Sequence, residues 1–305
     1  MKKGKLIAAA LAAAIALTGV GLAVYNADRE IDFGEIVIDG IPEKSADDLR
    51  IMSFNVRWCD DKAGSVRNRS KIATAIVDQY APDSFGVQEA TGNWLDILTE
   101  GLGGKYAYVG EARDEKGYES EFSAVFYLKD KYNLVDEGTI WLSETPEVKF
   151  SKSFDSACHR VATWAVLENK ETGERYTHLN THLDHVLEET RTAQIGVFID
   201  KLTELQKGGR VFCTGDFNTE PTSEAYAKML EVTDDARLAA VNGDEGITFH
   251  NYGKIAEGSS GPIDYIFVSK GTKVDTFKII RSTAKDMYPS DHYPIVADIS
   301  AEVQQ

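Results

Sequence analysis

Residues of the kinds that bind metals or move protons occur at the ends of several short apolar segments. Asn55 lies in the segment SFNVRW, Glu89 in GVQEA and Asp264 in PIDYIFVS. Others of these kinds are His182 in NTHLDH, Asp216 and Asn218 in TGDFNTEP, and Asp291 and His292 in PSDHYPI. Because α/β proteins tend to place ligands where buried strands end, we expect these side chains to share one site. Each residue alone is a weak indication, since an Asn or Asp at a strand end is more often a turn or a helix cap.

Several of these residues could bind a divalent cation or move a proton. Asn55 and Glu89 offer hard oxygen ligands suited to Mg²⁺ or Mn²⁺. Asp216 and Asn218 are two residues apart, so in an extended chain both side chains would point to the same side.

A zinc site is a competing interpretation of His178, His182 and His185, whose spacing would align them on one face of a helix. Residues 175–183 alternate like a strand, however, and four residues of strand would separate His178 from His182 by about 13 Å. One zinc ion cannot bridge that distance. We therefore expect His178 to be a packed strand residue.

Arg160, in CHRVATW, is a candidate for substrate binding. Its guanidinium could clamp a phosphate with two hydrogen bonds, but an ion pair with one of the many acidic residues explains it equally well. A further group could line the substrate side, although loop structure is an equal explanation. This group comprises Asp184, His185, His250 and Tyr252.

The elements that would position these residues begin with a strand over residues 51–58, a helix over 70–80 and a strand over 84–88. In the helix, Ile72, Ile76, Val77 and Tyr80 fall on one face. Further strands are expected over 121–128, 161–168, 175–181, 210–214, 261–269 and 295–299, with a helix over 191–205. Such runs of strands mixed with helices favour two packed sheets with outer helices over one doubly wound parallel sheet.

In this order, the polar motifs resemble those of the endonuclease/exonuclease/phosphatase superfamily, the deoxyribonuclease-I-like metal-dependent phosphoesterases. The resemblance runs from about residue 50 to residue 299, and GDFN with SDHYPI is its most specific part. It implies an α/β (α+β) four-layer sandwich, in which two mixed β-sheets pack face to face with helices on the outside. That fold agrees with the two sheets expected from the element pattern.

The resemblance also implies phosphodiester hydrolysis as the reaction, and roles in it for the motif residues. That reaction needs charge neutralised on the nonbridging oxygens, an oriented water molecule, and help for the leaving alkoxide. Mg²⁺, with Mn²⁺ as the alternative, would be held by three residues, Asn55, Glu89 and Asp291. Asp216 would orient or deprotonate the attacking water, and Asn218 would donate a hydrogen bond to the pentacoordinate phosphorane. His182 would hydrogen-bond the scissile phosphate. Asp264 would hold His292 in the correct tautomer, much as the Asp of a catalytic triad positions its base.

The composition bounds the class of protein and its partners. A chain of 305 residues with 43% hydrophobic and 27% charged residues is neither disordered, collagenous nor a coiled coil. Residues 28–305 hold 30 of the 33 basic residues and all 49 acidic ones, a net charge of about −19. This balance disfavours a long footprint on DNA or RNA. It still permits phosphate chemistry, because a bound divalent cation can invert the local field.

The N-terminus predicts membrane targeting. Lys2, Lys3 and Lys5 precede an uncharged run over residues 6–25, which as a helix would span about 30 Å, the thickness of a bilayer core. We expect residues 1–27 to be a membrane anchor or, as the alternative, a cleaved signal, with the lysines inside and the rest of the chain outside. Residues 28–48 are expected to be an acidic linker, and residues 49–303 the catalytic domain.

Three functions remain open from the sequence. The leading hypothesis is an exported Mg²⁺-dependent phosphoesterase that acts on a small or lipid-linked phosphate ester or phosphodiester. An extracytoplasmic metal-dependent nuclease is the alternative. A degenerate, membrane-tethered binding module is the third, and the complete set of motif residues speaks against it.

Overall fold

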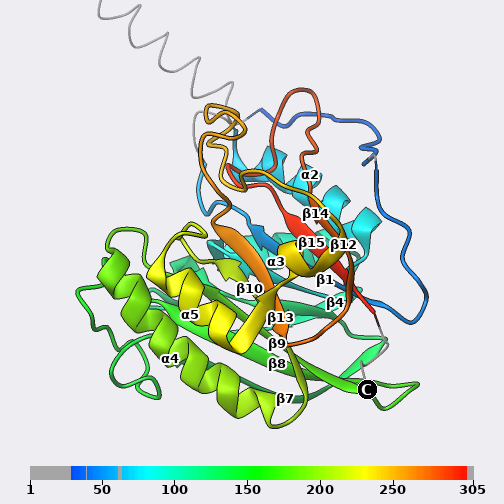
Figure 1. The fold of residues 1–305 in the computed structure, drawn as a ribbon. Helices are drawn as coiled ribbons and strands as arrows, with labels where there is room; N and C mark the ends of the chain where they lie inside the picture. Colours follow the sequence, from blue (N-terminus) through cyan, green and yellow to red (C-terminus); the bar gives the residue numbers. More distant parts are fainter. Residues whose placement is uncertain (1–28, 39, 61–63, 301–305) are drawn as a thin grey trace, which may run out of the picture.

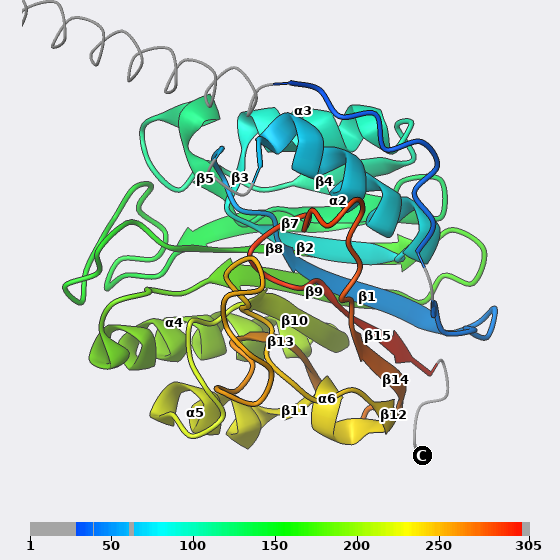
Figure 2. The same ribbon diagram turned by 90° about the horizontal axis from the view of Figure 1, so that it is seen from above.

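The computed structural model describes residues 29–38, 40–60 and 64–300. Two large β-sheets pack face to face, and helices cover the outer face of each sheet (Figures 1 and 2). A separate two-stranded sheet pairs β3 (Ala90–Thr91) with β5 (Glu121–Phe122). These layers confirm the four-layer sandwich that the motifs implied.

The first large sheet has seven strands and is mixed, because β1 runs parallel to β2 and antiparallel to β15. Across the sheet they are β12 (Ala240–Gly243), β14 (Val274–Ile279), β15 (Ile295–Ile299), β1 (Leu49–Asn55), β2 (Ser84–Gln88), β6 (Val125–Leu128) and β4 (Tyr106–Val109). Helices α2 (Val66–Tyr80) and α3 (Gly92–Gly101) cover this sheet. The predicted apolar face of α2 is buried at all four positions.

The second large sheet has six strands. In order they are β11 (Thr233–Asp235), β13 (Asp264–Ser269), β10 (Arg210–Asp216), β9 (Arg175–His182), β8 (Val161–Asn169) and β7 (Tyr132–Trp141). Helices α4 (Glu188–Gln206) and α5 (Glu224–Val232) lie along its outer face (Figure 1). The short α6 (Ala236–Ala239) joins β11 to β12, and η1 (Gly117–Glu119) precedes β5.

Strand alternation distributes side chains between three apolar layers. In β1, Met52 and Phe54 pack toward the helices, whereas Ile51 packs between the sheets. In β10, Cys213 packs toward α4 and α5, whereas Phe212 packs between the sheets. Because successive strand residues point to opposite faces, every second residue from Ile51 or Phe212 onward faces the space between the sheets.

Several element boundaries differ from the sequence prediction. The strand expected over 51–58 ends at Asn55, and Arg57 adopts a left-handed backbone conformation with φ 59°. The strand expected over 210–214 continues to Asp216 because β13 and β9 both pair with it there. The strand expected over 121–128 is divided into β5 and β6, which belong to different sheets.

The described part of the acidic segment before β1 is irregular, as predicted, but it packs on the domain. Ile38 is buried, and its backbone N–H donates to Gln79 Oε1 of α2 at 3.0 Å. The backbone N–H of Ile31 donates to Asn68 Oδ1 at 2.8 Å. The predicted membrane segment, residues 6–25, lies outside the described residues. Among the helices that are described, none has both the length and the apolar character to cross a bilayer.

Candidate active site

Three neighbouring strands of the second sheet bring polar residues together in register. Asp216 at the end of β10 lies opposite His182 on β9 and opposite Asp264 on β13. Residues paired in register point to the same face of a sheet, and here that face is the one between the two sheets. The three motifs that contain these residues therefore form one cluster.

The first sheet contributes Asn55 and Glu89 to the same end of the sandwich. Asn55 ends β1, and Glu89 follows β2 in a left-handed conformation with φ 57°. The Asn55 amide nitrogen donates to Asp216 Oδ2 at 2.9 Å and to Glu89 Oε1 at 3.2 Å. Asn55 thus connects the carboxylates of the two sheets.

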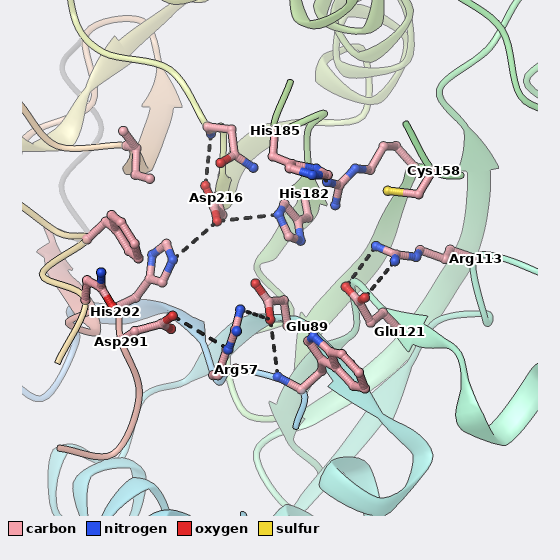
Figure 3. A pocket seen from close by; sticks show the side chains of 16 residues that line it. Arg57, Glu89, Arg113, Glu121, Cys158, His182, His185, Asp216, Asp291 and His292 are labelled. Atoms are coloured by element: carbon pink, nitrogen blue, oxygen red, sulfur yellow. Dashed lines mark hydrogen bonds and ion pairs between the residues drawn. The ribbon is translucent and has the colours of Figure 1, made fainter. Parts of the chain in front are cut away.

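The Asp216 carboxylate lies between two imidazole rings. His292 Nε2 is 3.7 Å and His182 Nε2 is 3.5 Å from Asp216 Oδ2 (Figure 3). The other ring nitrogen of His292, Nδ1, is 2.9 Å from Asp264 Oδ2. The arrangement forms a chain from Asp264 through His292 to Asp216, as the motif resemblance implied for Asp264 and His292.

Burial and charge give these groups distinct protonation behaviour. Burial, and then the charge of Asp264, raises the pKa of Asp216 to about 7. Burial lowers the pKa of His292, but the carboxylates of Asp264 and Asp216 outweigh it and raise that pKa to about 10. Burial, together with the positive charge of Arg160, holds the pKa of His182 well below its usual value. At neutral pH the cluster therefore combines a cationic His292 with a neutral His182.

Glu89 and Asp291 concentrate negative charge in one part of the site. Arg57 Nη1 is 3.7 Å from Glu89 Oε2, and Arg57 Nε is 3.7 Å from Asp291 Oδ2 (Figure 3). Burial raises the pKa of Asp291, which indicates a carboxylate short of compensating charge. The two carboxylates are hard oxygen donors, so they fit a divalent cation such as Mg²⁺.

The orientation of Asn55 does not suit its predicted role as a direct metal ligand. Its carbonyl oxygen accepts from the Arg57 backbone N–H at 3.1 Å, and its amide nitrogen faces Glu89 and Asp216. In this orientation Asn55 holds the carboxylates in place, and it would offer oxygen to a cation only after an amide flip.

A second group, Asp216, Asp264 and His292, offers atoms within 4.8 Å of one another. The hydrogen bond between His292 and Asp264 already uses one nitrogen and one carboxylate oxygen, so this group suits proton movement better than metal binding.

The backbone at Asn218 is not extended, whereas the sequence predicts an extended segment from Asp216 to Asn218. Asn218 has a left-handed conformation with φ 48°, and its backbone N–H donates to Asp216 Oδ1 at 2.9 Å. Its side-chain amide donates to the carbonyl of Leu183 at 3.1 Å. Asn218 still lines the pocket, but a turn places it there, because Asp216 is the last residue of β10.

The cluster lines one pocket of about 460 Å³, shown in Figure 3. Seven of the nine predicted site residues line it, namely Glu89, Arg160, His182, Asp216, Asn218, Asp291 and His292. The other two, Asn55 and Asp264, are buried behind it and reach it through their hydrogen bonds to Asp216 and His292.

Arg160 is 4% exposed and its guanidinium is incompletely bonded. Arg160 Nη2 is 3.1 Å from His185 Nδ1, whereas Nε and Nη1 have no hydrogen-bond partner among the described residues. The alternative of an ordinary ion pair finds no support, because no carboxylate of the described chain lies within ion-pair distance of it. Buried donors left without partners are costly, so Arg160 is suited to receive an anion from the pocket.

The residues proposed for the substrate side divide into two groups. His185 lines the pocket, whereas Asp184 accepts hydrogen bonds from the backbone N–H groups of the two loops around it. His250 is buried against Tyr293, with ring centroids 3.8 Å apart, and Tyr252 is also absent from the pocket wall. Loop structure is thus the better explanation for Asp184 and His250.

His178 is fully buried on β9, as expected. Its ring lies 2.7 Å from Ser84 Oγ and 2.8 Å from Thr214 Oγ1. These two contacts occupy both ring nitrogens, which removes His178 from any zinc site shared with His182.

Sequence reasoning missed several residues of the pocket wall. Arg57 and Trp58 follow Asn55 directly, so their place in the NVRW segment was an available signal. Cys158 likewise lies in the CHRVATW segment of Arg160, whereas Arg113 and Glu121 carry no such signal. Glu121 reaches the pocket because β5 pairs with β3, the strand that begins immediately after Glu89.

Comparisons with known proteins agree with the fold and the motifs. Among solved structures, an endonuclease/exonuclease/phosphatase from Bacteroides vulgatus is 32% identical, with a TM-score of 0.78 over 84% of this chain and 99% of that one. A mannosyl-6-phosphatase from Bacteroides thetaiotaomicron is 30% identical, with a TM-score of 0.75 over 83% of this chain and 99% of that one. Human Nocturnin is 26% identical over 195 residues, 58% of this chain and 43% of Nocturnin.

The chain spans less than half the length of the curated relatives it matches. The model of the Endonuclease/Exonuclease/phosphatase family matches residues 52–292, which include all nine predicted site residues. The chain therefore belongs to this family of metal-dependent hydrolases that act on phosphoester bonds.

Proposed function

We propose that the protein is an exported, Mg²⁺-dependent phosphoesterase that hydrolyses a small phosphate ester. The observation that carries the proposal is Arg160, a buried guanidinium with two unpartnered nitrogens on the wall of the pocket that holds Asp216 and His182. A phosphate placed there would accept from Arg160 and from neutral His182 while facing Asp216. This supports the predicted substrate-binding role of Arg160.

The charge distribution favours a compact substrate. The chain from residue 28 carries a net charge of about −19, so a polyanion would be repelled at each phosphate outside the pocket. Within the pocket, Arg160 has two nitrogens without a hydrogen-bond partner among the described residues, and Mg²⁺ held by Glu89 and Asp291 would add the positive charge that reverses the local field. A small phosphate would therefore contact only the pocket, whereas a polyanion would also contact the acidic surface around it.

The proposed chemistry uses the protonation states of the site. Asp216 accepts a proton from a water molecule as its oxygen attacks phosphorus, the ester bond breaks, and the departing alkoxide takes up a proton from water to leave as the alcohol. Cationic His292, held by Asp264, orients Asp216 and favours its ionised form against the burial that raises its pKa. Glu89 and Asp291 would hold Mg²⁺, which when bound neutralises charge on the phosphate oxygens.

The comparison with the mannosyl-6-phosphatase supports a phosphatase, because that protein matches over nearly its whole length. A nuclease remains the alternative, since the family name includes endonucleases and exonucleases. One observation favours it: Trp58 is 48% exposed on the pocket wall, and an exposed aromatic ring can stack on a base.

Export is part of the proposal and rests on the sequence. Three lysines before an uncharged run place the following residues outside the cytoplasmic membrane under the positive-inside rule. The uncharged run over residues 6–25 would serve as a membrane anchor, with secretion after cleavage as the alternative.

The test is ester hydrolysis by the full-length protein in detergent, measured as inorganic phosphate released from monoesters and as alcohol released from diesters. The panel should contain hexose phosphates, p-nitrophenyl phosphate, bis-p-nitrophenyl phosphate and a phospholipid headgroup ester, each with Mg²⁺ and with EDTA. We expect Mg²⁺-dependent turnover of at least one small ester and none in EDTA or with Asp216→Asn. Full activity of the unmodified protein in EDTA would contradict the assignment.

A further inference from the structure

The pocket has a second polar wall, formed by Arg113 and Glu121, that the proposed hydrolysis does not use. In Figure 3 these two residues lie across the pocket from Asp291 and His292, with Glu89 and His182 between. Arg113 Nη1 donates to Glu121 Oε2 at 2.8 Å, and Arg113 Nη2 donates to Glu121 Oε1 at 2.6 Å. The side chains are 16% and 17% exposed, so the pair is largely desolvated yet accessible from the pocket.

The loop that carries the pair is held in place without the side chains. The Arg113 backbone N–H donates to the carbonyl of Glu121 at 3.1 Å, and Trp141 Nε1 donates to the carbonyl of Arg113 at 2.9 Å. Glu121 also pairs with Thr91 in the small sheet. Because the backbone is already fixed, the side-chain pair is preorganised for a ligand.

The pair keeps hydrogen-bonding capacity after its two internal bonds. A guanidinium has five N–H donors and a carboxylate about four acceptor sites, so about three donors and two acceptor sites remain. Arg113 Nε in particular has no hydrogen-bond partner among the described residues. The remaining donors and acceptors lie side by side, which matches neighbouring hydroxyl groups, because each hydroxyl both donates and accepts.

Charge decides between the possible ligands. Glu121 neutralises Arg113, so the pair offers no net positive charge to a second phosphate. An apolar group would leave desolvated charged groups without partners, which is unfavourable. A neutral group with several hydroxyls meets neither penalty.

Arg160 and the wall formed by Arg113 and Glu121 belong to the same pocket as the reacting groups. All three residues line it together with His182 and Asp216. A phosphate on Arg160 would therefore leave its alcohol part inside the pocket that Arg113 and Glu121 also line.

We propose that Arg113 and Glu121 form the subsite that recognises the hydroxyl groups of the alcohol part of the substrate, and that this alcohol is a sugar or another polyol. The inference rests on the proposed phosphoesterase function and names the substrate class for it. Discrimination against an ester lacking hydroxyls should be large, because a site built to bond hydroxyls leaves its buried groups unpaired without them.

The test compares a hexose 6-phosphate with p-nitrophenyl phosphate, whose alcohol has no additional hydroxyls. For each full-length variant, the ratio of kcat/KM on the two esters is measured with saturating Mg²⁺. We expect Glu121→Gln and Arg113→Met to lower the ratio by at least about tenfold, the effect of losing one hydrogen bond to a charged group. Glu121→Asp should restore part of it.

A matched control is Glu168→Gln, which removes a carboxylate paired with Arg175 outside the pocket and should leave the ratio unchanged. Equal losses on both esters in folded Glu121→Gln protein would show that the pair only supports the loop, and an unchanged ratio would place the hydroxyls elsewhere. Either result would overturn the inference. Failure of the proposed function is distinct, since the unmodified protein would then release phosphate from neither ester.

Discussion

The proposed hydrolysis depends on the chain of side chains from Asp264 through His292 to Asp216. If Asp216 accepts the proton of the attacking water, Asp216→Asn leaves the geometry but removes the base. If His292 supplies the positive charge beside it, His292→Ala leaves Asp216 uncompensated. We expect either change to lower kcat on p-nitrophenyl phosphate by at least about 10²-fold, the low end for general acid–base residues. A loss below about threefold in folded protein would remove the residue from the reaction.

The pKa values predict a bell-shaped pH dependence. Activity requires ionised Asp216 and protonated His292, so kcat/KM should rise through about pH 7 and fall through about pH 10. The charge of Asp264 raises both pKa values. Asp264→Asn should therefore move both limbs to lower pH, which a purely structural substitution would not do. The measurement is kcat/KM from pH 5 to 11 at saturating Mg²⁺.

The residues of the reacting cluster were predictable because they occur in compact motifs. The motifs GDFN and SDHYPI assign Asp216 and His292 to the same predicted site, and in the structure the two side chains lie next to each other. The Asn55 amide orientation was not predictable, since it depends on carboxylates from two sheets. Arg113 and Glu121 were missed because only tertiary pairing brings them to the pocket.

At the scale of elements, a buried polar network joins the two sheets below the reacting cluster. Ser84 of β2 contacts His178 of β9, which contacts Thr214 of β10, and Thr214 donates to Asn180 Oδ1 at 2.9 Å. Gln88 of β2 donates to the same Asn180 oxygen at 2.7 Å. The network thereby fixes the offset between the sheet that provides Glu89 and the sheet that provides Asp216.

His178→Gln tests this network. At pH 7.5 we expect it to lower the free energy of unfolding by about 1–3 kcal/mol, because buried partners lose a hydrogen bond. Burial lowers the pKa of His178 to about 3, so between pH 6.5 and 3 the unfolded chain binds a proton that the folded chain excludes. The unmodified protein therefore loses stability there as pH falls, and the difference between the two proteins should shrink at pH 4.5. Urea unfolding of both proteins at pH 7.5 and 4.5 measures this difference in the free energy of unfolding. A difference that widens in acid would contradict a neutral buried His178.

Gly86 makes the approach of the sheets possible. A Cβ at Gly86 would lie 2.2 Å from Thr214 Oγ1 and 2.4 Å from Asn180 Oδ1, which is shorter than any normal contact. We expect Gly86→Ala to destabilise the protein by about 3 kcal/mol through overpacking. Gly196→Ala is the matched control, because Gly196 lies in α4 with nothing within 4 Å of its Cβ position, and it should stabilise by about 0.5–1 kcal/mol. Equal unfolding midpoints for the two variants would show that the sheets have room at Gly86.

Strands buried on both faces were predictable from their apolar runs, and β2 and β15 match the predicted ranges at both ends. The edge strand β7 was missed because much of it is exposed and its sequence, YNLVDEGTIW, lacks a regular alternation. The segment before β1 was interpreted as a linker from its acidic residues. Its apolar residues Phe33, Ile36 and Ile41 pack against the core and account for the difference.

At the scale of the whole molecule, the proposed topology places the acidic domain outside the cytoplasmic membrane. Protease added to intact spheroplasts of a bacterial expression host should digest the protein while a cytosolic marker survives. Replacing Lys2, Lys3 and Lys5 by Glu should weaken this orientation. Complete protection of the unmodified domain, with the same marker intact, would contradict export.

The most direct test of the central claim is the preference of the unmodified protein for small phosphates over polynucleotides. kcat/KM with Mg²⁺ should be compared for the best small monoester, a single-stranded RNA and plasmid DNA at about 50 and 200 mM salt, where counterion release separates the substrates. We expect a preference for the small ester of more than about tenfold at both salt concentrations, because the net charge of about −19 on residues 28–305 repels a polyanion. Efficient cleavage of RNA or plasmid with no turnover of any small phosphate would contradict it.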